Sequence, residues 1–366
     1  MRRAVDSGRA VVVKIGSSSL TTAGGLIDDT AIDRVVSQIA DLRRVGHPSV
    51  LVSSGAVAAG LPSLGVSDRP TDMPGLQAAA AVGQSKLIER YAGAFAAHDL
   101  VVGQVLLTRD VLANREPHLH ARAAFDRLLS LGVVPIVNEN DTVVVEELRF
   151  GDNDRLAAIV SHLVGAGLLV ILTDTPGLYA HDPRLVAEPE LLGAVRHTDE
   201  VLDELRLASE AGSFGSGGVA TKVAAARMAA YSGIPTVVTA ANDPGAVRRA
   251  VAGEDVGTWV EPRSSALAAR KLWIAFSLRT EGVLTVDAGA AGAIADDSRS
   301  LLAAGVTQVD GEFARGSAVE IRDPTGRLIG KGLAGLASGT LRGALGEHTS
   351  VAGGAAVHRD DLIVLV

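Results

Sequence analysis

The feature that most limits how this chain can fold is a series of short, continuous apolar runs separated by longer amphipathic segments. Such runs lack the alternation of a half-exposed strand and are typical of parallel strands covered by helices on both faces. Strands that alternate with helices build a parallel α/β sheet with right-handed crossovers. The predicted strands are Ala10–Val13, Val50–Val52, Val101–Leu107, Val133–Val137, Leu168–Leu172 and Thr236–Val238.

The segments between these runs carry helical spacing. In the first of them, the apolar positions that share one helical face are Ile32, Val35, Val36 and Ile39. Asp28 or Asp29 is suited to cap the start of this helix, and Gly46 is suited to end it. Two Ala-rich segments, Ala78–Ala97 and Val219–Ser232, are also predicted helices.

The pattern changes near residue 260, which divides the chain into two predicted domains. After about residue 280, short strand-like pieces are separated by turn residues, including an Asp-Pro-Thr-Gly turn at 323–326. These predicted strands are Gly282–Val286, Ala318–Ile321, Leu328–Ile329 and Leu362–Val366. We therefore expect a catalytic α/β domain over residues 1–275 and a small, mostly β domain over residues 279–366.

Composition excludes several classes of protein. The chain has no cysteine, which removes disulfides, thiolate nucleophiles and Cys-ligated zinc. A net charge of −8 does not favour a general nucleic-acid-binding surface. The longest apolar stretch, residues 163–172, is about half the length of a membrane span, and nothing resembles an export signal. We expect a cytoplasmic protein without a membrane partner.

Polar residues follow four of the predicted strands directly. In open parallel sheets the active site lies at the carboxyl ends of the strands, so these residues should meet at one edge. That edge would collect a lysine, hydroxyl groups, amides and carboxylates. The four segments are Lys14–Gly16, Ser53–Gly55, Asn138–Asp141 and Thr173–Asp174. This convergence is the main physical argument for an active site, since each segment alone has a simpler explanation.

A lysine and a glycine-rich loop suit polyphosphate binding. Lys14 precedes Gly16 at the end of a predicted strand, and the loop Gly215–Gly218 opens the helix that contains Thr221 and Lys222. Exposed N–H groups and the dipole of a helix N-terminus favour phosphate. Taken singly, these features also fit a solvated lysine beside a turn and a flexible loop. The loop follows no predicted strand, so a dinucleotide-binding fold is excluded.

Asp152, Asn153 and Asp154 precede an amphipathic helical segment. They fit simple helix capping, but beside Asn138 and Asp141 they also suit binding of an ammonium group, orientation of lysines or approach to magnesium. Ser54 lacks a G-x-S-x-G context and an assignable histidine base, so we expect a turn or a substrate hydrogen bond rather than a nucleophile. The pair His118 and His120 is expected to lie in a polar surface loop and not to bind metal.

Taken together, these segments resemble the amino acid kinase family, and within it the bacterial glutamate 5-kinases. The resemblance runs over nearly the whole chain, and its tail resembles a PUA domain. The motifs of the first domain are VVVKIGSSSL (11–20), VSSGAVAAG (52–60), AAVGQSKLI (80–88), GQVLLTR (103–109), VPIVNENDTV (134–143), FGDNDRLAA (150–158), ILTDTPGLYAHDPR (171–184) and GSGGVATK (215–222). Those of the tail are GVLTVDAGAAGAI (282–294), SLLAAGVTQVDGEFARG (300–316) and AVHRDDLIV (356–364).

The resemblance implies an αβα sandwich around a mainly parallel sheet, followed by a small PUA-like β domain. It implies transfer of the ATP γ-phosphoryl group to the side-chain carboxylate of L-glutamate, which is the first step of proline synthesis. Mg²⁺ would be carried by ATP, with no protein ligand directly assigned. The implied catalytic residues are Lys14, Lys222 and Asp154. The implied glutamate-binding residues are Ser54, Asp141, Asn153 and Asn138. The implied ATP-binding residues are Lys14, Gly16, Thr173, Asp174, Ser216, Gly217, Gly218, Val219, Ala220, Thr221 and Lys222.

The resemblance also implies a homo-oligomer, either a tetramer or a dimer, and feedback inhibition by proline. Two alternatives stay open. One is another member of the family, acting on acetylglutamate, aspartate or a nucleotide. The other is an RNA-linked regulatory protein that acts through the tail. Residues 279–366 contain 8 basic and 11 acidic residues, so we expect weak or absent RNA binding.

Overall fold

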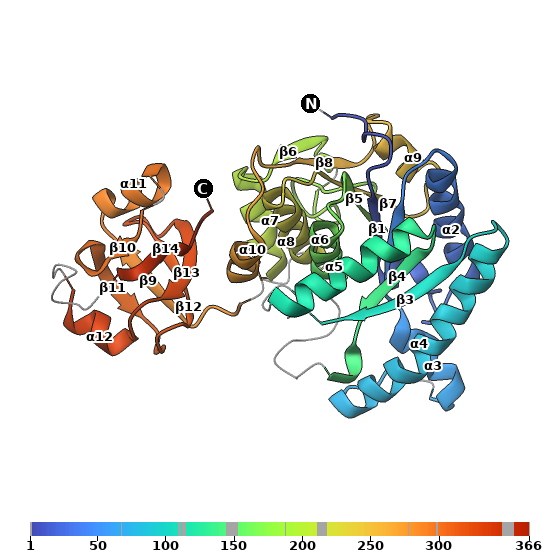
Figure 1. The fold of residues 1–366 in the computed structure, drawn as a ribbon, viewed down its shortest axis with the longest axis horizontal. Helices are drawn as coiled ribbons and strands as arrows, with labels where there is room; N and C mark the ends of the chain where they lie inside the picture. The colour runs from blue at the N-terminus through green and yellow to red at the C-terminus, as the bar shows by residue number, and fades with distance from the viewer. Residues whose placement is uncertain are drawn as a thin grey trace. The chain divides into compact units, whose positions relative to one another are not determined.

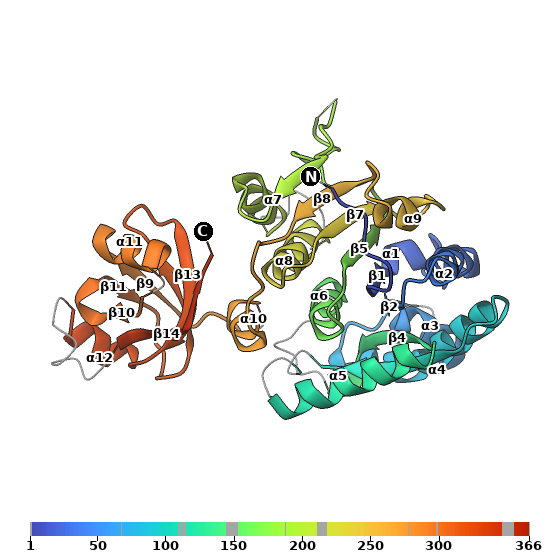
Figure 2. The ribbon, with the colours of Figure 1, turned by 45° about the horizontal axis from the view of Figure 1, so that its top comes forward.

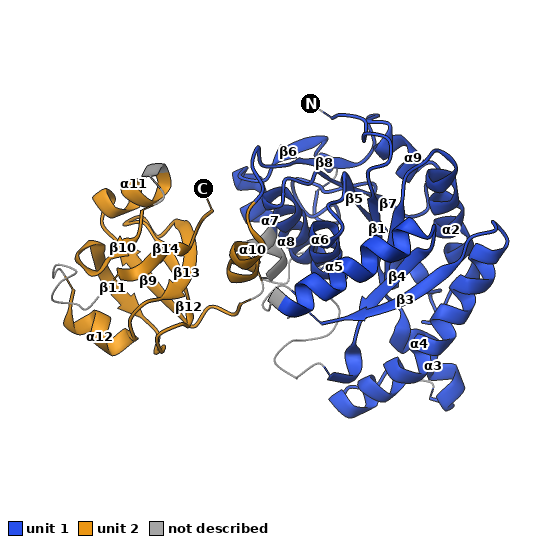
Figure 3. Cartoon of the chain, in the orientation of Figure 1, with its two compact units in different colours: residues 1–266 blue, residues 267–366 orange. Residues whose placement is uncertain are grey.

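The computed structural model describes residues 2–66, 68–108, 111, 115–143, 153–186, 188–210, 218–276, 278–297, 299–345 and 355–365. Two compact units divide between Ala266 and Leu267, and Figure 3 shows them in different colours. The sequence boundary was drawn later, after residue 275. The difference is a single helix, α10 (Ala269–Phe276), which packs with the second unit.

The first unit is built on one sheet, in which eight strands are seen among the described residues in the order β3-β4-β2-β1-β5-β7-β8-β6. Every neighbouring pair is parallel except β7 and β8. The predicted mainly parallel sheet is thus confirmed. The strands are β1 (Val11–Ile15), β2 (Ser49–Ser53), β3 (Val102–Leu107), β4 (Val134–Glu139), β5 (Leu168–Thr173), β6 (Ala194–Arg196), β7 (Thr236–Ala240) and β8 (Thr258–Glu261).

Helices cover both faces of this sheet, as Figure 2 shows, with α5, α6 and α8 on one face and α2, α4 and α9 on the other. The helices of this unit are α1 (Ser17–Leu20), α2 (Asp29–Arg44), α3 (Ala56–Leu64), α4 (Met73–Ala96), α5 (Arg115–Ser130), α6 (Asn153–Leu163), α7 (Glu200–Glu210), α8 (Gly218–Tyr231) and α9 (Ala246–Val251). Among the described helices, none is long and apolar enough to cross a membrane.

Alternation along β1 positions the first functional side chain. Val11, Val13 and Ile15 join the core formed with α2, α4 and α9. Val12 and Lys14 therefore face the opposite side, where α6 packs against β1. Lys14 is the fourth residue of the strand, so it lies inside β1 rather than beyond it, and it is buried.

One predicted strand is correct in position but wrong in burial. The run Val101–Leu107 was expected to be covered on both faces, yet β3 lies at the edge of the sheet (Figure 1) and pairs with β4 on one side. Val101 is 67 % exposed and Leu106 is 38 % exposed. Apolar composition alone does not reveal whether a strand has a neighbour on its second side.

The helix boundaries follow local capping. Asp28 accepts a hydrogen bond from the backbone N–H of Thr30 and caps α2, as predicted. Gly46 has φ +89°, a left-handed conformation that favours glycine after a helix. The next Ala-rich helix, α4, starts five residues before the predicted position, because Asp72 caps it through the N–H of Gly75.

The second unit contains a mostly antiparallel sheet with the order β10-β14-β13-β12-β9-β11 among the described residues. All four predicted tail strands are present, whereas β10, β11, α11 and α12 were not predicted. Lys331 is buried on β13 and donates hydrogen bonds to the carbonyls of Ala275 and Leu278, which ties α10 to this sheet. The elements are β9 (Gly282–Val286), α11 (Ala288–Asp297), β10 (Leu301–Leu302), β11 (Val306–Asp310), β12 (Ala318–Arg322), β13 (Leu328–Ala334), α12 (Ser338–Gly343) and β14 (Ala355–Val364).

Candidate active site

One strand and two helices bring two lysines to one carboxylate. Lys14 Nζ on β1 lies 2.5 Å from Asp154 Oδ1 at the start of α6. Lys222 Nζ on the first turns of α8 lies 3.7 Å from Asp154 Oδ2. The Thr221 hydroxyl donates to Asp154 Oδ2 at 2.7 Å, and Lys222 also donates to the carbonyl of Gly218 at 3.0 Å. The structure thus joins residues that are more than 200 positions apart.

The electrostatics of this cluster favour an ionised aspartate. Burial alone would raise the pKa of Asp154, because a carboxylate loses its hydration. The positive charges of Lys14 and Lys222, together with hydrogen bonds from Lys14 and Thr221, outweigh burial and lower the pKa of Asp154. One carboxylate beside two ammonium groups leaves a net positive charge, which suits a transferring phosphoryl group.

Asn153, the neighbour of Asp154, joins three segments of the site. Its Nδ2 lies 2.8 Å from the Ser53 carbonyl oxygen, 3.0 Å from Ser54 Oγ and 2.8 Å from Asn138 Oδ1, so its two N–H groups are shared among three acceptors. Asn138 Oδ1 also accepts from the backbone N–H of Glu139. These bonds tie the carboxyl ends of β2 and β4 to the start of α6, so Asn153 has a structural part in addition to any contact with substrate.

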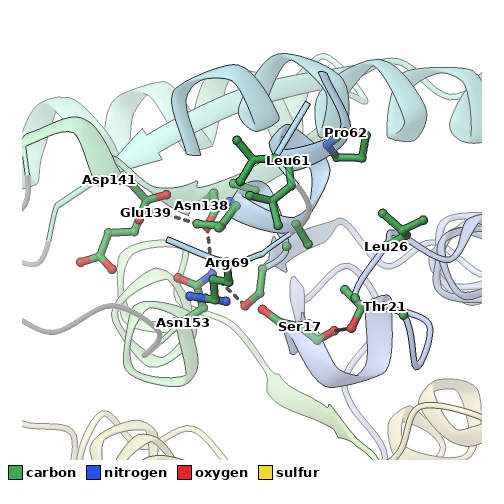
Figure 4. Close-up of a pocket in the computed structure, with 18 residues that line it drawn as sticks. Ser17, Thr21, Leu26, Leu61, Pro62, Arg69, Asn138, Glu139, Asp141 and Asn153 are labelled. Atoms are coloured by element: carbon green, nitrogen blue, oxygen red, sulfur yellow. Dashed lines mark hydrogen bonds between the residues drawn. The ribbon is translucent and has the colours of Figure 1, made fainter. Parts of the chain in front are cut away.

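A cavity of about 360 Å³ opens beside these residues (Figure 4). Ser54, Asn138, Asp141 and Asn153, the four residues predicted to bind substrate, all line it. Its other walls come from α1, the loop before α2, α3 and the segment that follows α3. Asp154 and the two lysines lie next to this cavity rather than in its lining, and the consecutive residues Asn153 and Asp154 connect the two parts.

Among the described residues that line it, the pocket has two acidic side chains and one basic side chain. Burial, and then the negative charge of Glu139, raise the pKa of Asp141 to about 6, while Gln84 and Arg69 act in the opposite direction. Glu139 and Arg69 line the same cavity. Such a pocket favours a ligand that carries both charges.

The predicted nucleotide-binding residues lie along the same sheet edge. Gly16 follows β1, and Thr173 ends β5, where its hydroxyl donates to Asp174 at 2.9 Å. Since β5 pairs directly with β1, both segments lie beside Lys14. Gly218, Val219, Ala220, Thr221 and Lys222 form the start of α8. Ser216 and Gly217 lie outside the described residues, as does Asp152.

Several residues at this site were not assigned from the sequence. Arg69 and Thr21 line the pocket and lie outside the quoted motifs. Ser17 and Glu139 also line it and lie within the motifs at 11–20 and 134–143, where their place after predicted strands was a usable signal. Behind the pocket, the hydroxyl groups of Tyr91 and Ser53 lie 2.8 Å apart in the core. Tyr91 lies in a predicted helix, but no role was assigned to it from the sequence.

The two histidines considered as a metal pair lie on helix α5 and not in a loop. His120 is exposed and lies 3.7 Å from Glu116, whereas the ring of His118 lies 5.8 Å from that of His162, centroid to centroid. Within the described part of the chain, no group of three or more acidic or histidine side chains is arranged to hold a metal ion.

Comparison with known proteins agrees with this geometry. The model of the amino acid kinase family matches residues 9–240, and the model of the PUA domain matches residues 282–351. Glutamate 5-kinase from Myxococcus xanthus is 47 % identical over 100 % of this chain and 98 % of its own length. Glutamate 5-kinase from Streptomyces coelicolor is 45 % identical, with the same coverage of both chains.

Among solved structures, a carbamate kinase from Giardia lamblia bound to AMP-PNP has the same fold over the first unit. Its TM-score is 0.50 at 16 % identity, and it covers 70 % of this chain and 99 % of its own. The likeness extends to the fold alone. With the family model over residues 9–240, the two-lysine cluster and the full-length relatives, the chain belongs to the amino acid kinase family and carries a PUA domain after its kinase domain.

Proposed function

We propose that this chain is an ATP-dependent kinase that converts L-glutamate to L-glutamyl 5-phosphate, the first step of proline synthesis. The observation that carries the proposal is a pocket of mixed charge next to a buried carboxylate held between two lysines. The full-length relatives named glutamate 5-kinase support the choice of substrate.

In the proposed reaction, an oxygen of the side-chain carboxylate attacks the γ-phosphorus of ATP. The new P–O bond forms as the bond to the bridging oxygen of ADP breaks. The acceptor is already ionised, so the step requires no general base. Catalysis then depends on alignment and on neutralising charge. Lys14 and Lys222 would contact the transferring group, and Asp154 would hold both ammonium groups at the correct positions.

ATP would lie along the edge formed by Gly16, Thr173, Asp174 and the start of α8. The N–H groups at the N-terminus of α8 favour phosphate, and Lys222 lies one turn further on. We propose that Mg²⁺ enters as MgATP, where it would reduce the charge of the phosphates.

The charge of the pocket also supports glutamate over its acetylated form. Asp141 and Glu139 would attract a free α-ammonium group, and acetylation removes that charge. Ser54, Asn138 and Asn153 connect this end of the pocket to Asp154, so the substrate would reach the lysines with its distal carboxylate. Proline inhibition, a tetramer or dimer, weak RNA binding and a cytoplasmic location stay predictions.

The direct test is to incubate the protein with MgATP, L-glutamate and hydroxylamine. Hydroxylamine converts an acyl phosphate to a hydroxamate before it cyclises. We expect γ-glutamyl hydroxamate and ADP in equal amounts, with neither formed when ATP or L-glutamate is omitted. Parallel reactions with N-acetylglutamate and L-aspartate test the other family activities. Turnover with one of these and not with L-glutamate would overturn the substrate while leaving the family intact.

A further inference from the structure

The substrate pocket contains one positively charged side chain among its described lining residues, and this side chain is Arg69. The residue lies between α3 and α4, three positions before the Asp72 cap of α4. Figure 4 shows the Arg69 side chain among the residues that line the pocket, which also include Asn153 and Asn138. Its position therefore puts a guanidinium group where a bound substrate would lie.

The guanidinium group of Arg69 has no hydrogen bond or ion pair with any other residue that the structure describes. Its charge nevertheless acts on Asp141, whose pKa it lowers against the larger effects of burial and Glu139. Arg69 is thus near the acidic side chains without being neutralised by direct contact with them. Its five N–H donors are suited to bind a planar carboxylate through two bonds.

The chemistry of an α-amino acid matches this distribution of charge. If the distal carboxylate reaches the lysines, the α-carbon lies at the other end of the pocket, near Asp141. The ammonium group on that carbon has two acidic partners, but the α-carboxylate on the same carbon would be repelled by them. A cation is required beside these acids, because an unpaired carboxylate that loses its hydration is costly.

We propose that Arg69 binds the α-carboxylate of the substrate and, together with Asp141, makes the pocket selective for a zwitterionic amino acid. This inference rests on the proposed function. Arg69 is then a specificity residue that contacts the substrate away from the reacting carboxylate. It acts on ground-state and transition-state binding alike, so its loss raises KM more than it lowers kcat.

The test compares three acceptors in wild type, Arg69→Gln and Asp141→Asn. L-Glutamate carries both α groups, 4-aminobutyrate lacks the α-carboxylate, and glutarate lacks the ammonium group. Acceptors with no measurable turnover are compared as competitive inhibitors of L-glutamate. We expect Arg69→Gln to raise the KM for L-glutamate by ~10- to 100-fold, the range for a hydrogen-bonded charged group. The variant should weaken the binding of glutarate by a similar factor, and it should change the binding of 4-aminobutyrate by less than about threefold.

Asp141→Asn should give the complementary pattern: it should weaken the binding of L-glutamate and 4-aminobutyrate but not the binding of glutarate. Arg69→Lys, which keeps the charge, should recover part of the loss. Arg44→Gln, a change at an exposed arginine on α2, is the matched control and should alter none of these values. An unchanged KM for L-glutamate in Arg69→Gln, or equal losses for all three acceptors, would overturn the inference. Absence of L-glutamate turnover in wild type would instead count against the proposed function.

Discussion

The Asp154 carboxylate lies 2.5 Å from the Lys14 ammonium group, and only 3 % and 5 % of these two side chains are exposed. Two charges with so little access to water stabilise each other, but neither is tolerated well alone. The same carboxylate accepts the hydroxyl of Thr221 and faces Lys222. One aspartate therefore connects β1, α6 and α8 at the point where we expect phosphoryl transfer.

Replacing Asp154 with asparagine should affect both stability and rate. The change leaves the buried Lys14 without its partner, which typically costs ~3–5 kcal/mol in the free energy of unfolding. Urea denaturation measures this loss, and the hydroxamate assay measures kcat. The double variant Asp154→Asn, Lys14→Met should recover much of the stability and none of the activity. If the single variant is as stable as wild type, the ion pair does not contribute to the free energy of unfolding as its burial indicates.

Lys222→Ala should lower kcat while leaving the KM for L-glutamate within about twofold. Its ammonium group contacts Asp154 and the start of α8, away from the residues that line the substrate pocket. Removing a charge that stabilises the transition state typically lowers kcat by ~10²- to 10³-fold. Lys86→Ala, on the exposed surface of α4, is the control. A variant at Lys222 with normal kcat would remove this lysine from the chemistry.

The raised pKa of Asp141, about 6, predicts a pH dependence of substrate binding. Below pH 6 the side chain becomes neutral and loses its attraction for the ammonium group, so the KM for L-glutamate should rise as pH falls. Asp141→Asn should show a high KM with no such rise. Initial-rate measurements between pH 5 and pH 8 distinguish the two profiles.

The same shift predicts a cost in stability. A carboxyl group whose folded pKa is above its ordinary value of 3.8 holds its proton more tightly in the folded state. Stability is therefore lost as pH rises from about 4 through about 6, and the ionised group destabilises the free protein at neutral pH. We expect Asp141→Asn to raise Tm at pH 7.5 and to change it little at pH 4. Equal effects at both values would contradict the assignment.

Tyr91→Phe should reduce stability more than activity. The Ser53 hydroxyl donates its single proton to the Ser54 carbonyl, so the Tyr91 hydroxyl is the donor to Ser53. Burial raises the pKa of Tyr91, which keeps it protonated. Loss of this bond should cost ~0.5–1.5 kcal/mol in unfolding free energy. Because Ser53 keeps its bond to the Ser54 carbonyl, kcat should fall by less than about threefold. A larger fall would assign Tyr91 a direct part in ordering the Ser54 loop.

Two glycines on α4 give a matched pair. A Cβ at Gly83 would lie 1.7 Å from the carbonyl oxygen of Ala56, the first residue of α3, whereas a Cβ at Gly93 would have no neighbour within 4 Å. Gly83→Ala should destabilise the protein by ~1–3 kcal/mol or more and raise the KM for L-glutamate, since α3 begins two residues after Ser54. Gly93→Ala should stabilise it by up to ~1 kcal/mol. Thermal unfolding and initial-rate measurements give the stability and the KM of the two variants. Equal changes in Tm for Gly83→Ala and Gly93→Ala would exclude close packing of α3 on α4 as the cause.

The sequence determined the periodic features of this protein. Continuous apolar runs predicted the parallel strands, and polar residues after those runs predicted which edge carries the site, because these patterns depend on backbone geometry and burial along one segment. Lys14 could therefore be found without coordinates from its place after a strand, and Asn153 and Asp154 from their place before a helix. The motifs, and their order along the chain, indicated the family.

The tertiary structure decided the pairings between distant segments and the charge state that they produce. No periodicity showed that Asn153 ties the ends of β2 and β4 to α6, that β3 is an edge strand, or that Arg69 lies among the acids of the pocket. The raised pKa of Asp141 likewise requires burial and the nearby Glu139. These properties depend on distances between residues far apart in the chain, because Coulomb energy and desolvation vary with position in space and not with separation in sequence.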